Sequence, residues 1–346
     1  MNSAGLIFKW LPSENTSSQK TRNYAHKIRQ YLNFTHKRYR KMLSIGREKT
    51  KVLERLMSNN EWSKIDFSKI PSRAGLIYRN AFARRDILRE RYEKFIMDKN
   101  TKVNAKVLYP YECVESALKR RGRDRLERAA INKYWDNLRD YFNGAAFNGM
   151  ALVDVSGSMT IQHNSIAPIN IAIALGLYCA EKCSGPYKGY FITFESNPHF
   201  IEVEGEDFVE KVKNMHNAPW GGSTNIEKAF DLMLQVAIRN NLSQEDIPKN
   251  LIIISDMEFD AATRGHNFCP LCDSIKNDWA AAGYKMPHLV FWNCNARHDL
   301  IPMQDDGEVT FVSGASPVIF EMIMSGKTGK EMMKEKLESE RYSCIH

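Results

Sequence analysis

Three short polar segments of the chain carry side chains that can bind a hard divalent cation. Residues 154–158, Asp-Val-Ser-Gly-Ser, follow a short apolar run, and Ser255-Asp256 follow another. Between them, residues 220–225 form a glycine-rich loop, Trp-Gly-Gly-Ser-Thr-Asn, directly before a predicted helix. Carboxylate and hydroxyl oxygens suit Mg²⁺, which takes few protein ligands and keeps several waters, with Mn²⁺ as the alternative. The candidate ligands are Asp154, Ser156, Ser158, Thr224 and Asp256.

The elements that must position these side chains form an α/β pattern in the second half of the chain. Apolar runs of strand length alternate with helical stretches, which predicts a doubly wound, mostly parallel sheet of Rossmann-type topology. In such sheets ligands bind beyond the carboxyl ends of the strands, and Asp154 and Ser255-Asp256 fall at such ends. The predicted strands are 149–154, 189–194, 199–203, 250–255, 288–292 and 309–312, and the predicted helices are 166–183, 225–239, 274–282 and 317–324.

The first half of the chain is predicted to be all-helical. Its apolar spacing indicates helices over 23–57, 73–98 and 112–142, the last with a kink at Gly122, and no strand alternation appears before residue 148. We therefore expect a basic all-helical domain at 1–146 and an α/β domain with the metal site at 147–326. A charged C-terminal helix or tail is expected at 327–346.

The two halves of the chain carry opposite charge. Residues 1–150 contain 33 Lys and Arg against 15 Asp and Glu, a net charge of +18, and residues 151–346 contain 16 against 26, a net charge of −10. Such asymmetry favours a basic module that binds a polyanion, joined to an acidic module with another role. The alternative is that the two halves attract each other.

Basic residues of the first half cluster on its predicted helices, with Tyr39, Tyr78, Tyr92 and Tyr134 between them. Guanidinium groups can bind phosphates and aromatic rings can stack on unpaired bases, so we expect these helices to bind RNA or another polyanion. For any single cluster, a solvated helix face paired with nearby acids is the simpler interpretation. The candidate nucleic-acid contacts are Arg38, Arg40, Lys41, Arg84, Arg85, Arg89, Arg120, Arg121 and Arg123.

Composition predicts an intracellular protein. No run of about 18 uncharged apolar residues occurs, which argues against a transmembrane helix. The seven cysteines, an odd number, favour free thiols in a reducing compartment. We expect a cytoplasmic location, with the nucleus or, for a virus-encoded chain, the host cytoplasm or the virion as alternatives. His266, Cys269 and Cys272 offer a lone Cys-x-x-Cys with an upstream histidine, a pattern that favours loop thiols over zinc.

The three polar segments together resemble the metal-ion-dependent adhesion site of von Willebrand factor A domains. The resemblance rests on Asp-x-Ser-x-Ser at 154–158, Gly-Ser-Thr at 222–224 and Ser-Asp at 255–256, and it spans roughly residues 146–326. One departure lies beside the site, because residues 257–260 are Met-Glu-Phe-Asp where many relatives have a glycine. These residues add two carboxylates.

The resemblance implies a role for each candidate ligand. Ser156 and Ser158 would bind the metal directly, and Asp154 and Asp256 would act largely through water. Thr224 would bind or release the metal together with the ligand. The open metal position of such domains accepts a carboxylate from a partner protein, so the resemblance implies a binding module.

The whole chain also resembles a family of plants, bacteria and large DNA viruses that joins a helical N-terminal region to such a domain. The residues that carry this resemblance are 9–13 (Lys-Trp-Leu-Pro-Ser), 71–73 (Pro-Ser-Arg), 78–82 (Tyr-Arg-Asn-Ala-Phe), 220–225 and 291–293 (Phe-Trp-Asn). In domain order and basicity the chain is more distantly similar to Ro-type RNA-binding proteins, where a von Willebrand-type domain closes a ring of helical repeats.

These observations favour a non-enzymatic, metal-dependent binding scaffold. Its helical half would bind RNA or another polyanion, and its metal site an acidic group of a protein partner. One alternative is a protein-only assembly module, and a second is a Mg²⁺-dependent phosphohydrolase. The second alternative needs a general acid two residues after Asp154, and Ser156 stands there.

Overall fold

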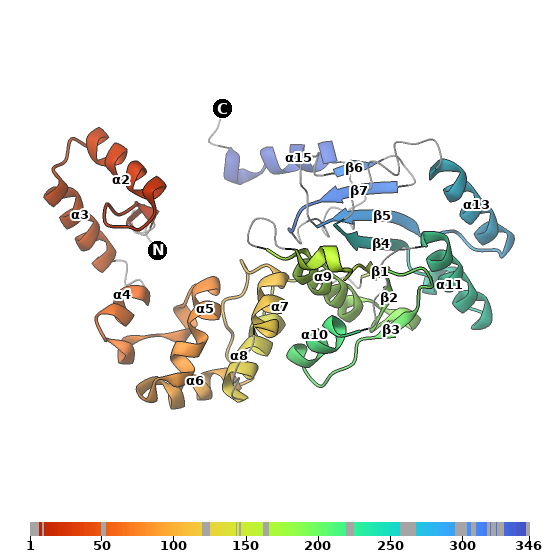
Figure 1. Ribbon diagram of the computed structural model, residues 1–346, viewed down its shortest axis with the longest axis horizontal. Helices are drawn as coiled ribbons and strands as arrows, with labels where there is room; N and C mark the ends of the chain where they lie inside the picture. Colours follow the sequence, from red (N-terminus) through yellow and green to blue (C-terminus); the bar gives the residue numbers. More distant parts are fainter. Residues whose placement is uncertain are drawn as a thin grey trace. The chain divides into compact units, whose positions relative to one another are not determined.

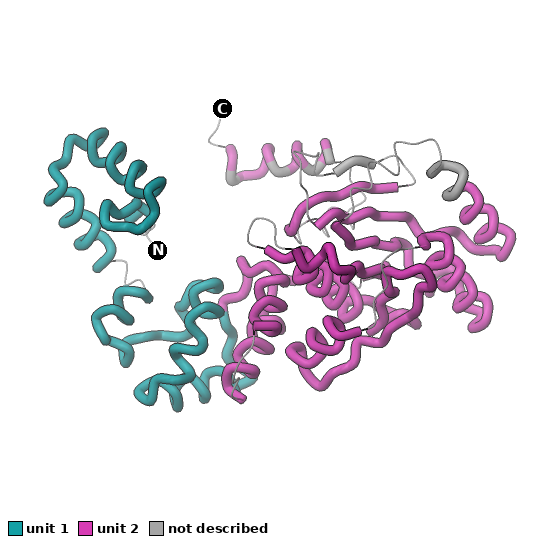
Figure 2. Tube along the Cα trace, viewed as in Figure 1, with its two compact units in different colours: residues 1–103 teal, residues 104–346 magenta. Residues whose placement is uncertain are grey.

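The structure, a computed structural model, separates into two compact units. Figure 2 colours them: the helical unit, Met1–Val103, and the sheet unit, Asn104–His346. The description below is of residues 7–8, 10–49, 53–119, 125–142, 144, 147–161, 166–218, 225–256, 268–294, 303–305, 309–316, 319, 323 and 329–343.

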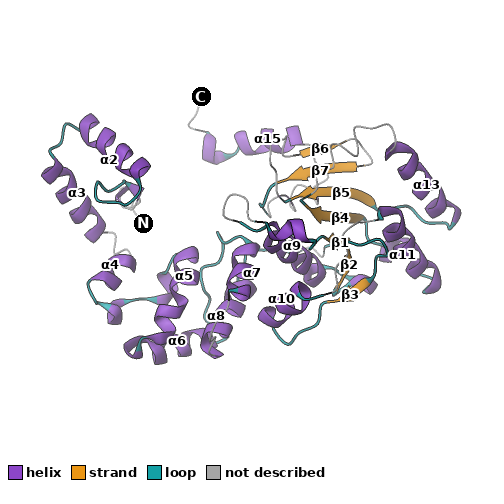
Figure 3. Ribbon diagram, in the orientation of Figure 1, coloured by secondary structure: helices purple, strands orange, loops and turns teal. Residues whose placement is uncertain are grey.

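The helical unit consists of short helices joined by turns and, between α4 and α5, by a longer connection over residues 59–71 (Figure 3). Ser18 caps the first of them by accepting the Thr21 N–H at 3.3 Å. The predicted helix 23–57 is interrupted at Asn33, whose φ of 51° is left-handed and cannot continue a helix. The predicted helix 73–98 is interrupted at Arg85, whose backbone is extended. The helices are α2 (Gln19–Tyr31), α3 (His36–Lys49), α4 (Leu53–Ser58), α5 (Ser72–Arg84) and α6 (Asp86–Met97).

Two small cores hold the helical unit together. Ala25 on α2 packs with Tyr39 and Leu43 on α3. Further along the chain, the ring of Phe67 lies 5.6 Å from Phe82 and 5.0 Å from Tyr92, centroid to centroid. Aromatic pairs at these separations stabilise a core beyond the area that they bury.

The sheet unit is built on a mostly parallel sheet, with seven strands among the described residues (Figure 1). The strand order is β3-β2-β1-β4-β5-β7-β6, and only the edge strands β3 and β6 run antiparallel to their neighbours. The order reverses between β1 and β4, which makes their carboxyl ends the expected ligand position. The strands are β1 (Gly149–Val153), β2 (Tyr190–Thr193), β3 (Phe200–Glu202), β4 (Asn250–Ser255), β5 (His288–Asn293), β6 (Met303–Asp305) and β7 (Val309–Ser313).

Helices cover both faces of this sheet. In Figure 1, α9 (Pro168–Lys182) and α10 (Phe208–His216) lie on one side, and α11 (Ile226–Arg239) and α13 (Phe268–Ala281) lie on the other. This arrangement follows from right-handed crossovers, because the chain adds β2 on one side of β1 and later adds β4 on its other side. It confirms the α/β class and the mostly parallel sheet that the sequence predicts.

Helix α9 is buried on two sides and fixes the position of β1. Twelve of its fifteen residues are buried. A Cβ built at Gly176 would lie 2.5 Å from Val153 Cγ2, so the glycine lets the helix approach the last residue of β1 closely. On its other side α9 packs against α7 (Pro110–Leu118), which forms a further layer.

Helices α7 and α8 (Arg125–Asp136) belong to the sheet unit, although we expected the domain boundary after residue 146. The Arg128 guanidinium on α8 binds Asp207, which caps the N-terminus of α10, and Glu210 of α10, with Nη2 at 2.8 Å and 3.1 Å from their oxygens. Trp135 stacks on Phe208 with ring centroids 4.1 Å apart. The compact units therefore divide after Val103, because α7 and α8 pack on the helices of the sheet.

The C-terminal segment is helical over part of its predicted range. Helix α15 spans Gly329–Leu337, inside the range 327–346 expected for a charged helix or tail. The predicted helix 317–324 lies mostly outside the described residues. In the part of the chain that is described, no helix has the length and apolar character needed to cross a membrane.

Candidate metal site and basic surface

Asp154 and Asp256 lie next to each other because β1 and β4 are paired in parallel. Val153 is in register with Ile254, and the Asp154 N–H donates to the Ile254 carbonyl at 2.9 Å. Each aspartate follows its strand at the same edge of the sheet. Their exposed fractions are 1% for Asp154 and 5% for Asp256, so both carboxylates are buried.

Both carboxylate oxygens of Asp154 accept hydrogen bonds. The Ser156 N–H donates to Oδ1 at 2.8 Å, and the Ser255 hydroxyl donates to Oδ2 at 2.5 Å. Burial raises the pKa of Asp154, and the charge of Asp256 adds to the rise, whereas the bonds from Ser255 and Ser156 oppose it. These bonds fix the carboxylate in one orientation at the end of β1.

The hydroxyls of Ser156 and Ser158 form a chain of contacts that ends at Asp256. The two Oγ atoms are 3.1 Å apart, and the Ser158 hydroxyl donates to Asp256 Oδ1, 98 residues away in the chain, at 3.1 Å. Neighbouring oxygens in an octahedral Mg²⁺ shell are separated by about 3 Å, since each lies about 2.1 Å from the ion. The Ser156–Ser158 and Ser158–Asp256 separations, each 3.1 Å, match this spacing.

The hydroxyls lie on the more exposed side of the cluster that the described residues form. Ser158 is exposed and Ser156 is half-buried, while the two carboxylates lie beneath them. A cation held here would face solvent, and a ligand could approach it from that side. Thr224, the fifth candidate ligand, and the acidic residues of 257–260 lie outside the described residues.

Cys294 lies beside this site, and sequence reasoning missed it. Its thiol donates to the Ser255 carbonyl at 3.3 Å, and the residue is buried. Burial raises the pKa of the thiol well above its usual range, and Asp256 and Asp154 add to the rise. Cys294 follows β5, the neighbour of β4. Its position at the end of a third strand could have indicated from the sequence that it lies near the site.

No zinc cluster is found where the structure can be described. Among those residues, no three or more His, Cys, Asp or Glu side chains group in a way that could hold a metal ion. His266 and the side chains of Cys269 and Cys272 lie outside the described part. The hydroxyl-rich cluster at 154–158 and 256 is of a different kind, because half of its candidate ligands there are serines.

Six of the nine candidate nucleic-acid contacts are exposed on the helical unit. The Arg38 guanidinium lies 4.2 Å above the Phe34 ring, and that of Arg85 lies 4.3 Å above the Trp62 ring. The exposed six are Arg38, Arg40, Lys41, Arg84, Arg85 and Arg89. The other three, Arg120, Arg121 and Arg123, lie outside the described residues.

The tyrosines expected to stack on bases are mostly core residues, and this expectation was wrong. Tyr39, Tyr92 and Tyr134 are 0%, 2% and 5% exposed. Tyr39 donates its hydroxyl to the Pro12 carbonyl at 2.9 Å, and burial raises its pKa. Tyr78 is half-buried. The rings of Tyr39, Tyr92 and Tyr134 are therefore buried in the protein, and the bases of an RNA cannot reach them.

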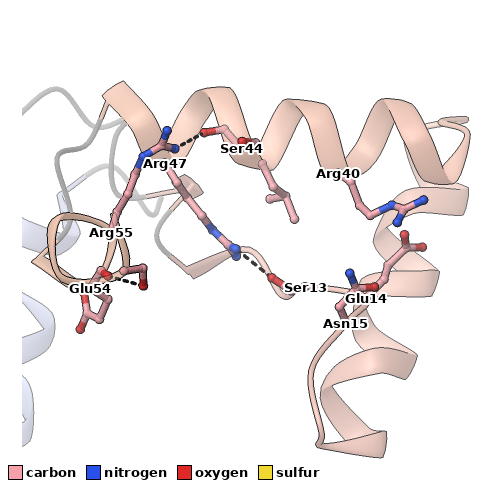
Figure 4. A pocket seen from close by; sticks show the side chains of 10 residues that line it. Ser13, Glu14, Asn15, Arg40, Ser44, Arg47, Glu54 and Arg55 are labelled. Atoms are coloured by element: carbon pink, nitrogen blue, oxygen red, sulfur yellow. Dashed lines mark hydrogen bonds between the residues drawn. The ribbon is translucent and has the colours of Figure 1, made fainter. Parts of the chain in front are cut away.

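A pocket of about 610 Å³ in the helical unit contains further arginines (Figure 4). Arg47 donates to Ser13 Oγ at 2.8 Å and to the Leu11 carbonyl at 2.7 Å, and Arg55 donates to the Ser44 carbonyl at 3.1 Å. These two guanidinium groups hold the N-terminal segment and α4 against α3. They act as structural ties of the unit.

Family comparisons divide the chain into two matched segments. Residues 148–343 match the family described as Domain of unknown function (DUF7788), and residues 5–142 match Domain of unknown function (DUF2828). The first match covers more than half of the chain. The chain belongs to the DUF7788 family.

Two further proteins are similar to this DUF7788 member. Uncharacterized protein L728 of Acanthamoeba polyphaga mimivirus is 36% identical over 93% of the chain, which spans 58% of that relative. The crystal structure of the Deinococcus radiodurans RO (RSR) protein matches with 15% identity and a TM-score of 0.44, over 94% of this chain and 60% of that one.

The two candidate sites fall in different matched segments. Asp154, Ser156, Ser158 and Asp256 all lie within the DUF7788 match. The exposed arginines from Arg38 to Arg89 lie within the DUF2828 match. The candidate cation ligands therefore belong to the DUF7788 segment and the basic surface to its N-terminal neighbour.

Proposed function

We propose that this chain is a non-enzymatic binding scaffold with two sites. The DUF7788 segment would hold Mg²⁺, with Mn²⁺ as the alternative ion, at Asp154, Ser156, Ser158, Thr224 and Asp256. The bound ion would offer a coordination position to an acidic group of a protein partner, as the resemblance to von Willebrand factor A domains implies. The helical unit would bind RNA or another polyanion.

One observation carries the metal part of this proposal. Oxygens from Ser156, Ser158 and Asp256 lie in a chain with 3.1 Å steps, although 98 residues separate Ser158 from Asp256. They gather at the reversal point of the sheet, where open α/β sheets bind ligands. Buried carboxylates beneath exposed hydroxyls suit capture of a cation that keeps an open face toward a partner.

The arrangement around Asp154 favours binding over phosphohydrolase chemistry. The Asp154 carboxylate is buried, and each of its oxygens already accepts a hydrogen bond, at 2.8 Å and 2.5 Å, which weakens it as a nucleophile. Ser156 occupies the position of the general acid and does not supply an acidic proton near neutral pH. The enzyme alternative would require turnover of a generic phosphomonoester that disappears in Asp154→Asn.

Charge supports the polyanion part of the proposal. The helical unit holds 24 Lys and Arg against 9 Asp and Glu over residues 1–103, a net charge of +15. Six of its candidate contacts are exposed. Phosphate binding by such surfaces releases condensed counterions, so the affinity falls steeply as salt rises.

A metal titration tests the first site. Mg²⁺ at a concentration about 100 times its dissociation constant should raise the free energy of unfolding by about 2.7 kcal/mol. Ser158→Ala should abolish most of this gain. Thr160→Ala is the matched control, since Thr160 bears an exposed hydroxyl two residues away that donates to the Gly157 carbonyl. An equal gain in the wild type and in Ser158→Ala would contradict the site.

A salt series with a structured RNA tests the second site. We expect the logarithm of the affinity for full-length protein to fall by several units per unit of log salt concentration. Binding that is absent even at low salt would reject RNA as the partner. The protein-only alternative would then explain the basic charge, with an acidic protein surface as the partner.

A further inference from the structure

Helix α2 carries a strip of alternating lysines and tyrosines. Lys20, Tyr24, Lys27 and Tyr31 follow one another at spacings of four, three and four residues. At 100° per residue these positions fall within about 60° of the helix circumference. We call them the Lys–Tyr strip.

The strip is exposed, whereas the adjoining face of α2 is packed. The exposed fractions of Tyr24 and Tyr31 are 53% and 90%, and both lysines are exposed. Ala25 and Ile28 are the α2 residues that pack in the core with α3. An aromatic ring that is 90% exposed gains little from folding, so Tyr31 is not explained by the core of the unit.

The arginines of the same helix show how its other cations are used. Arg22 donates to the Thr16 carbonyl at 3.2 Å, and Arg29 donates to Glu14 Oε1 and the Phe34 carbonyl, each at 2.9 Å. Within the described residues, the side chains of Lys20 and Lys27 make no ion pair or hydrogen bond. The arginines hold the fold of the unit, and the lysines remain available to a ligand.

We propose that the Lys–Tyr strip is a platform for single-stranded RNA. Unpaired bases would stack on the rings of Tyr24 and Tyr31, and the two ammonium groups would bind the phosphates beside them. This inference rests on the proposed function, because it names the surface and the form of RNA that the helical unit binds. It also differs from the sequence prediction, which placed base stacking on tyrosines that the core encloses.

Distance along the helix favours an unstacked strand as the occupant. Tyr24 and Tyr31 are separated by about 10 Å along the axis, at 1.5 Å per residue. Successive bases of a stacked strand are only about 3.4 Å apart, so one continuous stack cannot place neighbouring bases on both rings. RNA loops and bulges present unpaired bases that can be splayed apart, whereas duplex bases face one another.

Tyrosine variants of the full-length protein test the platform with a labelled oligouridine. The double variant Tyr24→Ala, Tyr31→Ala should bind the oligouridine at least about 25-fold more weakly, because each of the two base–aromatic stacks contributes at least about fivefold to affinity. Tyr24→Phe, Tyr31→Phe should bind like the wild type, since the ring remains. Tyr342→Ala, at an exposed tyrosine of the sheet unit, is the matched control and should also bind like the wild type.

Lysine variants and other probes complete the test. Lys20→Gln, Lys27→Gln should lower the salt slope by about 1.4, at about 0.7 per phosphate of a single strand, while the tyrosine variants leave the slope unchanged. Duplex RNA should bind the tyrosine double-alanine variant and the wild type equally. Circular dichroism should show the same helix content in all variants, because the substituted side chains are exposed.

The outcomes separate this inference from the proposed function. If the wild type binds oligouridine with a steep salt slope and the tyrosine double-alanine variant binds equally well, the platform is wrong and RNA binding stands. If phenylalanine weakens binding as much as alanine does, stacking is wrong. If the strip variants lose only binding to anionic lipid vesicles, the strip is a membrane contact. If the wild type binds no RNA, both the proposed function and this inference fail.

Discussion

The sheet edge and the surface of the helical unit both gather charged side chains, and they do so in opposite ways. At the sheet edge, Asp154 and Asp256 are buried and fixed by hydrogen bonds from residues distant in the chain. On the helical unit, Arg40, Lys41 and Arg84 stand exposed on the helices that carry them. The first arrangement exists only in the folded protein, whereas the second is set mainly by local sequence.

The difference determines how each region should respond to substitution. A buried carboxylate that accepts hydrogen bonds leaves orphaned donors when it is removed, and each buried orphan destabilises the fold by about 1–3 kcal/mol. Removal of an exposed cation leaves no buried group without a hydrogen-bond partner, so it changes the free energy of unfolding by less than about 0.5 kcal/mol. Stability measurements should therefore rank substitutions by region.

Asp154→Ala should show the largest effect. It orphans the Ser255 hydroxyl and the Ser156 N–H, so the free energy of unfolding of the metal-free protein should fall by about 3 kcal/mol, as measured by urea unfolding. Asp154→Asn should be milder, because its carbonyl oxygen still accepts one of these bonds. Equal stability of wild type and Asp154→Ala would show that the hydrogen bonds accepted by Asp154 do not stabilise the fold.

Asp207→Ala should have the next largest effect and depend on pH. Burial alone would raise the pKa of Asp207, but the bonds from Arg128, the Glu210 N–H and Asn132 outweigh it and hold this pKa below its usual range. The substitution removes a helix cap and an ion pair, which lowers the free energy of unfolding by about 2 kcal/mol at pH 7.

The sign of this pH dependence follows from the lowered pKa. The stabilisation by Asp207 is complete above the unfolded-state pKa of about 4 and is lost as the pH falls through the lower folded-state pKa. Urea unfolding between pH 7 and pH 3 should show the wild type converging on Asp207→Ala. A difference that stayed constant down to pH 3 would rule out the ion pair as its source.

Tyr39→Phe tests the core of the helical unit with a smaller change. Loss of the buried hydrogen bond to the Pro12 carbonyl, 2.9 Å long, should lower the free energy of unfolding by about 1 kcal/mol. RNA affinity in the salt series should not change, because the ring is buried. A marked loss of RNA affinity at unchanged stability would show that Tyr39 contacts the RNA.

Arg40→Gln with Lys41→Gln should have the smallest effect on stability and a clear effect on binding. Thermal unfolding should match the wild type within about 0.5 kcal/mol. The salt slope for single-stranded RNA should fall by about 1.4, at about 0.7 per phosphate. An unchanged slope would place the RNA on another face of the helical unit.

Sequence reasoning reached the parts of the fold that local patterns encode. The apolar runs at 149–153 and 251–254 predict central strands, and the structure pairs them in parallel. Strand β6 was missed because Met303–Asp305 is short and polar. The break at Asn33 was missed because apolar spacing continues across it, while only the left-handed backbone shows the turn.

The candidate site was predictable in its residue types but not in its surroundings. Asp154, Ser156, Ser158 and Asp256 follow from strand-end placement, and the structure brings all four together. The Ser255 hydroxyl on Asp154 depends on which way a strand-end side chain turns, which no spacing reveals. Tyr39 was assigned to base stacking although it shares a helical stripe with Leu43, and this stripe was the signal for burial.

The double burial of α9 has a consequence for how this chain can be inherited. Because α7 covers the face of α9 that the sheet leaves open, a substitution on either helix changes the packing of the other, although residues 5–142 match a separate family. Recombination between relatives at 143–147 would pair an α7 and an α9 that had never been selected together. Recombination near Val103 would instead take α7 and α9 from the same relative and so keep their interface intact.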